Sequence, residues 1–163
     1  MKTKYLLLVM IGLLGGSLLH AQNNTFKSIF EKYENEENVT IVSISKSMFN
    51  LIPGNLKTGN IDIKNVLPKI ESLLIITSDN SRMKEKMSAE FKSLIEKNKN
   101  YEELMRVKSD KTNVTFNIRK KGDMINELIM LVNDEEDFVA IQLLGNFLLE
   151  DIQKLATEAQ QTQ

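Results

Sequence analysis

The sequence predicts a two-layer α+β fold, in which an antiparallel β-meander in the C-terminal half carries helices packed on one face. First, four β-rich segments follow one another after residue 100 with only short breaks between them, and short connections join strands in antiparallel order. Second, polar and apolar residues alternate in the meander, which leaves one sheet face for helices to cover. Third, no linker, repeat or low-complexity run interrupts residues 22–163, which predicts a single α+β domain.

The N-terminal half is expected to alternate helices with strands. From Phe26, apolar residues recur at i, i+3, i+4 and i+7, which is the spacing of a helix with one buried stripe. β-Branched residues dominate residues 39–45, which is typical of a strand. The expected elements are, in order, a helix over 25–33, a strand over 39–45, a single helical turn over 48–52, a helix over 62–70, a buried strand over 73–77 and an amphipathic helix that begins after the polar run 78–81.

The C-terminal half is expected to form the meander and a closing helix. Residues 114–119 alternate strictly, which predicts a half-buried strand, whereas residues 124–132 become apolar on both faces, which predicts a central one. Turns are predicted at 121–123 and 133–137. The expected strands are 101–108, 114–119, 124–132 and 138–144, followed by a helix that Asn146 caps.

Residues 1–21 have the three zones of a cleavable signal peptide. Lys2 and Lys4 provide a positive start, residues 5–14 are almost uniformly apolar, and Ala21 is a small residue that suits cleavage before Gln22. A membrane span needs roughly 20 apolar residues, so an N-terminal anchor is the less favoured alternative. No cysteine follows the apolar run, which excludes a lipid-anchored export signal. We therefore expect a periplasmic or secreted protein without stable membrane insertion after cleavage.

The composition of the cleaved chain narrows the chemistry that it can use. Residues 1–21 contain two of the 21 basic residues and the single histidine, which leaves 19 basic and 22 acidic residues and a net charge of −3. This charge gives no driving force for binding nucleic acid, which is itself anionic. The whole chain also lacks cysteine. Without imidazole or thiol, thiolate nucleophiles and histidine bases are excluded and ordinary zinc sites are disfavoured, and we expect no cofactor and no metal site.

Several short motifs suggest chemistry but lack the structural context that it needs. Ser43-Ile44-Ser45-Lys46, Lys57-Thr58-Gly59 and Ser78-Asp79-Asn80 match the motif strings of penicillin-interacting serine enzymes, but their order differs and Ser43 falls within a predicted strand. The acidic run 134–137 lacks the alternating spacing and the glycine of a calcium loop, so a solvated turn is the better interpretation. No catalytic residue is predicted.

One surface of the predicted meander is a candidate binding site. Arg106 and Lys108 lie two positions apart on one predicted strand and Arg119 lies on the next, so we expect all three side chains on the polar face of the meander. Together they would bind an anionic group. The alternative is a solvated sheet face without a ligand, because antiparallel sheets commonly expose one side.

Several segments together resemble a known protein family. They are the exported N-terminus that ends in Ala21-Gln22 and the segments FKSIFEKY (26–33), VTIVSISKSMF (39–49), YEELM (101–105), RKKGD (119–123), EL (127–128) and LGN (144–146). With these segments the chain resembles the domain of unknown function 4252 family of exported Bacteroidetes proteins, over most of residues 22–163. The resemblance implies an exported location and a fold, and it supplies no activity and no catalytic residue. Some members look like lipoproteins, and the lack of cysteine here departs from that pattern.

The sequence favours a non-enzymatic periplasmic accessory or binding module, and it leaves the question of an enzyme open. The expected partner is an unknown envelope protein or a small ligand, and exposed strand edges of the meander offer a place for strand addition. The alternative is a carboxylate-dependent envelope hydrolase that acts on glycan. Such an enzyme needs two acids roughly 5–10 Å apart across a cleft, and sequence alone cannot identify that pair.

Overall fold

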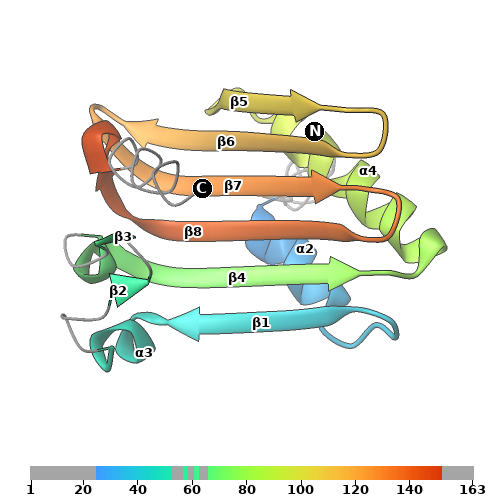
Figure 1. Ribbon diagram of the computed structural model, residues 1–163, viewed down its shortest axis with the longest axis horizontal. Coiled ribbons are helices and arrows are strands. Elements are labelled where there is room, and N and C mark those ends of the chain that lie inside the picture. The colour runs from blue at the N-terminus through green and yellow to red at the C-terminus, as the bar shows by residue number, and fades with distance from the viewer. Residues whose placement is uncertain (1–24, 53–56, 59–60, 63–65, 152–163) are drawn as a thin grey trace, which may run out of the picture.

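In the computed structural model, six antiparallel strands form one sheet in the order β1-β4-β8-β7-β6-β5 (Figure 1). The structure describes residues 25–52, 57–58, 61–62 and 66–151, so the predicted signal peptide and most of the predicted closing helix lie outside the described residues. The strands of the sheet are β1 (Thr40–Ser45), β4 (Ile70–Ser78), β5 (Tyr101–Lys108), β6 (Asn113–Lys121), β7 (Met124–Asn133) and β8 (Phe138–Leu148).

The strand order confirms the predicted meander and extends it. Strands β5 to β8 lie beside one another in chain order, β4 pairs with the free side of β8, and β1 pairs with β4. Gly122 turns the chain between β6 and β7 with a φ of 63°, a left-handed conformation that glycine adopts without strain. A separate two-stranded sheet contains β2 (Lys57–Thr58) and β3 (Ile61–Asp62). Strands β1 and β5 are therefore the two edges of the main sheet.

Two helices cover one face of the main sheet, which we call the inner face. They are α2 (Phe26–Tyr33) and α4 (Ser81–Lys97), and Figure 1 shows both behind the strands. The side chain of Thr25 accepts a hydrogen bond from Ser28 N, and that of Asn80 accepts one from Met83 N. Each side chain satisfies a backbone donor that the first helical turn leaves free. The predicted α+β class, with helices packed on one face of the sheet, is thereby confirmed.

The main core lies between these two helices and the sheet. Phe91 on α4 is fully buried, and its ring centroid lies 4.9 Å from that of Phe26 and 5.7 Å from that of Phe138. Lys84 Nζ holds α4 to the turn between β7 and β8 by donating to the carbonyl oxygens of residues 134–135, at 2.7 and 2.9 Å. The sheet contributes Ile76, Ile129, Leu131 and Ala140 to this core.

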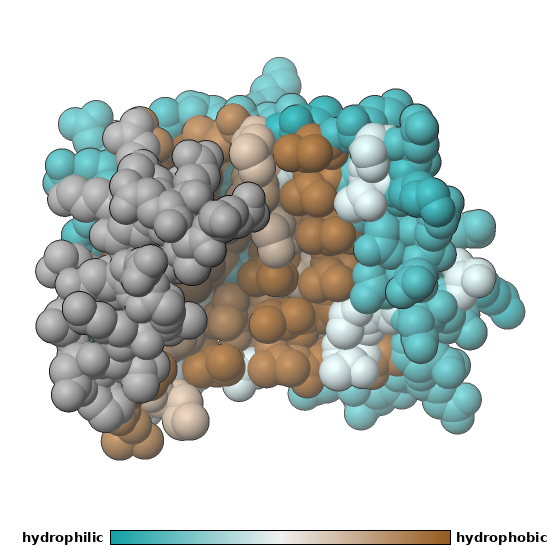
Figure 2. Space-filling view, in the orientation of Figure 1, coloured by the Kyte–Doolittle hydropathy of each residue, from teal (hydrophilic) through white to brown (hydrophobic). Residues whose placement is uncertain are grey.

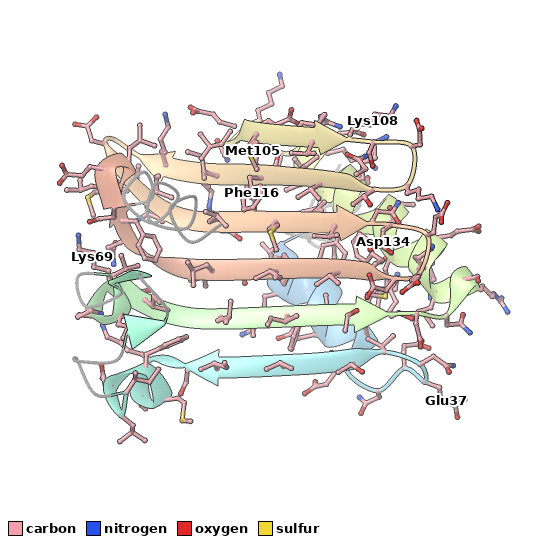
Figure 3. All side chains as sticks on the ribbon, in the orientation of Figure 1. Glu37, Lys69, Met105, Lys108, Phe116 and Asp134 are labelled. Carbon is pink, nitrogen blue, oxygen red and sulfur yellow. The ribbon has the colours of Figure 1, made fainter. Side chains whose placement is uncertain are left out.

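The opposite, outer face of the sheet is apolar along its middle and is covered at one end. Helix α3 (Lys46–Asn50) and the 3-10 turn η1 (Leu67–Lys69) lie there, and Phe49 joins a second buried cluster with Val66, Ile70, Ile118, Ile125 and Phe147. Beyond that cluster, Figure 2 shows a broad hydrophobic band on this face. Met105 and Phe116 lie side by side in this band (Figure 3).

The predicted helix over 62–70 is wrong in the part that the structure describes. Asp62 belongs to β3, residues 67–69 form η1 and Ile70 begins β4, while residues 63–65 lie outside the described residues. Pro68 explains the difference, because its ring clashes with the preceding helical turn and it has no N–H to donate. The strand predicted over 73–77 is therefore longer, and it occupies residues 70–78.

The predicted end of the last strand at residue 144 and the predicted capping role of Asn146 are also wrong. Strand β8 continues to Leu148, and Asn146 lies within it. The Asn146 side chain donates a hydrogen bond to Glu71 Oε1 at 2.9 Å and accepts one from Asn126 Nδ2 at 3.1 Å. It therefore links β8 to β4 and β7 instead of capping a helix. Helical backbone begins only at residues 149–151.

Candidate functional site

A pocket of about 640 Å³ opens on the inner face of the sheet, beside α2. Every strand of the main sheet contributes to its wall, and α2 closes one side. A pocket of this size falls within the range that holds small molecules. The strand residues that line it are Ser43, Ser72, Leu74, Tyr101, Arg119, Glu127, Gln142 and Leu144, and α2 adds Lys27, Phe30 and Glu31.

A buried carboxylate belongs to the wall of this pocket. Glu127 on β7 is 2% exposed, and its Oε2 atom lies 2.8 Å from Nη2 of Arg119, the directly paired residue on β6. Gln142 on β8 donates a hydrogen bond from Nε2 to Glu127 Oε1. The ion pair and the amide together offset the free-energy cost of burying a charge.

Tyr101 completes the polar group from the edge strand β5, where it pairs with Arg119 in the sheet register. Burial of the phenol and the nearby Glu127 carboxylate raise the pKa of Tyr101 above its ordinary value of 10, and Arg119 opposes this shift. The phenol therefore stays protonated at neutral pH. It presents a hydroxyl group to the same pocket as the Glu127 carboxylate.

One acceptor atom in this polar group, Gln142 Oε1, is buried and has no hydrogen-bond donor among the described residues. The neighbouring Glu127 carboxylate differs, because Arg119 Nη2 lies 2.8 Å from its Oε2 atom and Gln142 Nε2 donates to its Oε1 atom. Buried polar atoms are nearly always paired, so each unpaired one needs an explanation. Both Gln142 and Glu127 line the pocket.

The remaining wall of the pocket combines apolar surface with charges near α2. Phe30, Leu74 and Leu144 provide the apolar part. Lys27 and Glu31 on α2 are exposed and lie 3.6 Å apart as an ion pair. Because Arg119 already balances Glu127, the buried part of the pocket carries no net charge.

The structure places the three predicted basic residues on one face of the sheet but not in one site. By register, Arg106 lies opposite Thr115, Lys108 opposite Asn113 and Arg119 opposite Glu127. Arg119 lines the pocket around Glu127. Arg106 pairs with its neighbour Glu103 and lines a smaller cavity of about 80 Å³ under α4. Lys108 ends β5, as Figure 3 shows. Anion binding by these residues stays a prediction.

Sequence reasoning missed Glu127 and Gln142, although a signal was present. Glu127 is the single charged residue in the apolar segment 124–132, and Gln142 is the single polar residue in 138–144. An isolated polar side chain in a buried strand is costly unless it is paired, so such positions merit attention as site candidates. What the sequence could not show is that the two lie on adjacent strands and share one hydrogen bond.

The acids that line the pocket differ in burial. Within residues 25–151 as described, Glu127 is the buried carboxylate that lines the pocket, whereas Glu31 and Glu34 are exposed. No group of three acidic or imidazole side chains in the described ranges is arranged to hold a metal ion. In the acidic run, the Asp134 carboxylate accepts hydrogen bonds from the backbone N–H groups of Glu136 and Asp137, each with an N–O distance of 2.8 Å. These two bonds close the turn.

The fold and the pocket define a small α+β protein with a mixed-polarity cleft on its helix-covered face. A family model described as "Domain of unknown function (DUF4252)" matches residues 33–155, and the chain belongs to this family. No curated protein matches the chain. Among the described helices, none is both long and apolar enough to cross a membrane.

Proposed function

We propose that the protein is an exported, non-enzymatic binding module of the cell envelope, and that its inner-face pocket binds a small neutral saccharide. The observation that carries this proposal is the buried acceptor Gln142 Oε1, which has no hydrogen-bond donor among the described residues and belongs to the wall of a pocket of about 640 Å³. A ligand rich in hydroxyl groups supplies the missing donor. Export rests on the signal-like composition of residues 1–21.

The charge balance of the pocket supports a neutral ligand over an ionic one. Arg119 neutralises Glu127, so the buried part of the pocket gains little from a further cation or anion. Apolar surface from Phe30, Leu74 and Leu144 suits the C–H faces of a sugar ring, while the amide and the carboxylate suit its hydroxyl edges. Binding without hydrolysis is favoured over the glycan hydrolase because Glu127 has an ion-pair partner and faces no second buried acid among the described residues.

Calorimetric titration of the chain from Gln22 with a panel of neutral mono- and disaccharides tests this proposal. We expect one or more saccharides to bind, and Gln142→Met to weaken that binding about tenfold, since one lost hydrogen bond is worth up to about 1.5 kcal/mol. Asn117→Leu is the matched control, because Asn117 is also a buried amide on the inner face but lines the smaller cavity.

Two results would contradict the proposal. One is that no saccharide binds to protein whose circular dichroism and cooperative unfolding show it to be folded. The other is that Gln142→Met and Asn117→Leu weaken binding equally. Chromatography of the saccharide after prolonged incubation separates the two function classes, because a binding module returns it unchanged and a hydrolase does not.

A further inference from the structure

Strand β1 forms an edge of the main sheet without the protection that such edges usually carry. Its sequence, TIVSIS over Thr40–Ser45, contains no charge and no proline, and three of its six residues are β-branched aliphatics. It pairs on one side with β4 and, within the described part of the chain, with no strand on the other. Half of its N–H and C=O groups therefore point outward along about 20 Å of strand.

The opposite edge, β5, carries charges and a bulge that protect it against strand addition, and β1 has neither. Four of its eight residues are charged, and its register with β6 shifts between Glu103 and Met105, which marks a bulge. Glu103 and Arg106 already pair with each other. Charges and bulges are the usual means by which proteins prevent strand addition at an edge. The difference between the two edges within one sheet indicates that β1 is kept open for pairing.

We propose that β1 pairs with β1 of a second copy of this chain, antiparallel and about a two-fold axis at Val42. In this register Val42 lies opposite Val42, Thr40 opposite Ile44 and Ile41 opposite Ser43. Residues on the same sheet face are then opposed, as antiparallel pairing requires. A second copy suits this edge because the strand is its own complement, with no like charges to oppose each other.

The geometry of this pairing has two consequences. A two-fold axis perpendicular to the sheet keeps both inner faces on one side, so the two pockets open in the same direction. It also makes the apolar outer faces of the two copies continuous and covers Val42, which is 41% exposed in the single chain. An interface limited to one strand pair is small, which places it among weak, reversible associations.

Sedimentation equilibrium of the chain from Gln22, which contains every described element, tests the proposal over about 1 μM to 1 mM protein. We expect a monomer–dimer equilibrium within this range. Val42→Lys places two lysines opposite each other on the axis, and we expect it to raise the dimer dissociation constant about tenfold. Val107→Lys is the matched control, because Val107 is also exposed on the outer face, at the other edge.

A charge swap makes the test specific for the two-fold register. Val42→Glu alone is expected to dimerise as poorly as Val42→Lys, and an equimolar mixture of the two is expected to form a heterodimer with a dissociation constant near that of the unmodified chain. The proposal is overturned by a chain that stays monomeric at 1 mM, by a dimer that Val42→Lys leaves intact, by a dimer that Val107→Lys breaks equally, or by a mixture that does not associate.

Discussion

Raising the pH from about 8 to about 11 is expected to leave both tyrosines of the chain from Gln22 protonated for as long as the protein stays folded. The sequence has three tyrosines, and Tyr5 lies in the segment that we expect to be removed. Burial and the nearby Glu90 carboxylate raise the pKa of Tyr33 above its ordinary value of 10. Burial and the nearby Glu127 carboxylate do the same for Tyr101. No tyrosine with an ordinary pKa remains.

The size of the effect follows from these shifts. A tyrosine with a pKa near 10 is about 90% ionised at pH 11, so the unfolded chain should carry roughly 1.8 phenolates. The folded chain should carry close to none, because Tyr33 is fully buried and the Tyr101 phenol faces a carboxylate. The raised pKa values stabilise the fold at pH values below about 10, and this stabilisation is lost as the pH rises further.

Absorbance at the phenolate band near 295 nm measures the effect directly, with far-ultraviolet circular dichroism recorded in parallel to show that the chain is folded. Addition of denaturant at the same pH gives the full phenolate signal as the reference. Tyr33→Phe and Tyr101→Phe assign the remaining signal to one site each. A folded chain that shows one or more phenolates at about pH 11 would refute the reasoning, and the single variants would show which environment was misjudged.

The other predictions concern stability. Phe91→Ala should lower the free energy of unfolding in urea by about 3–5 kcal/mol, because the ring is fully buried and packs against two others with centroids 4.9 and 5.7 Å away; a loss below about 1 kcal/mol would contradict this. Arg119→Met should destabilise the fold more than the double change with Glu127→Leu, because the single change leaves a buried carboxylate unpaired; a double-mutant cycle without coupling would argue against it. The N–H groups of Asp137 and Glu136 hold the pKa of Asp134 below its ordinary value of 3.8. The melting temperature of the unmodified chain should therefore exceed that of Asp134→Ala at neutral pH, and the difference should shrink as the pH falls below about 4. A difference in melting temperature that is constant with pH would exclude this role.

Local pattern was sufficient to predict most of the secondary structure. The apolar spacing from Phe26 gave the helix that the structure places at 26–33, and the alternation in 114–119 lies within β6. These predictions succeed because helical and strand periods depend on residues close together in the chain. The errors fall at Pro68 and Asn146, where local signals compete: a favourable helical pattern contains a residue that stops it, and a good capping residue pairs across strands.

The sequence alone also determined which reactive groups are missing, because composition does not depend on folding: the chain from Gln22 has neither imidazole nor thiol. Only the tertiary structure decided that β4 and β1 join the meander beside β8. It alone brought Arg119, Glu127 and Gln142 from three strands into one buried group, and it alone separated Arg119 from Arg106. The physical reason is that strand order and register set the distance between residues remote in sequence, and both are fixed by burial of the whole sheet rather than by any local pattern.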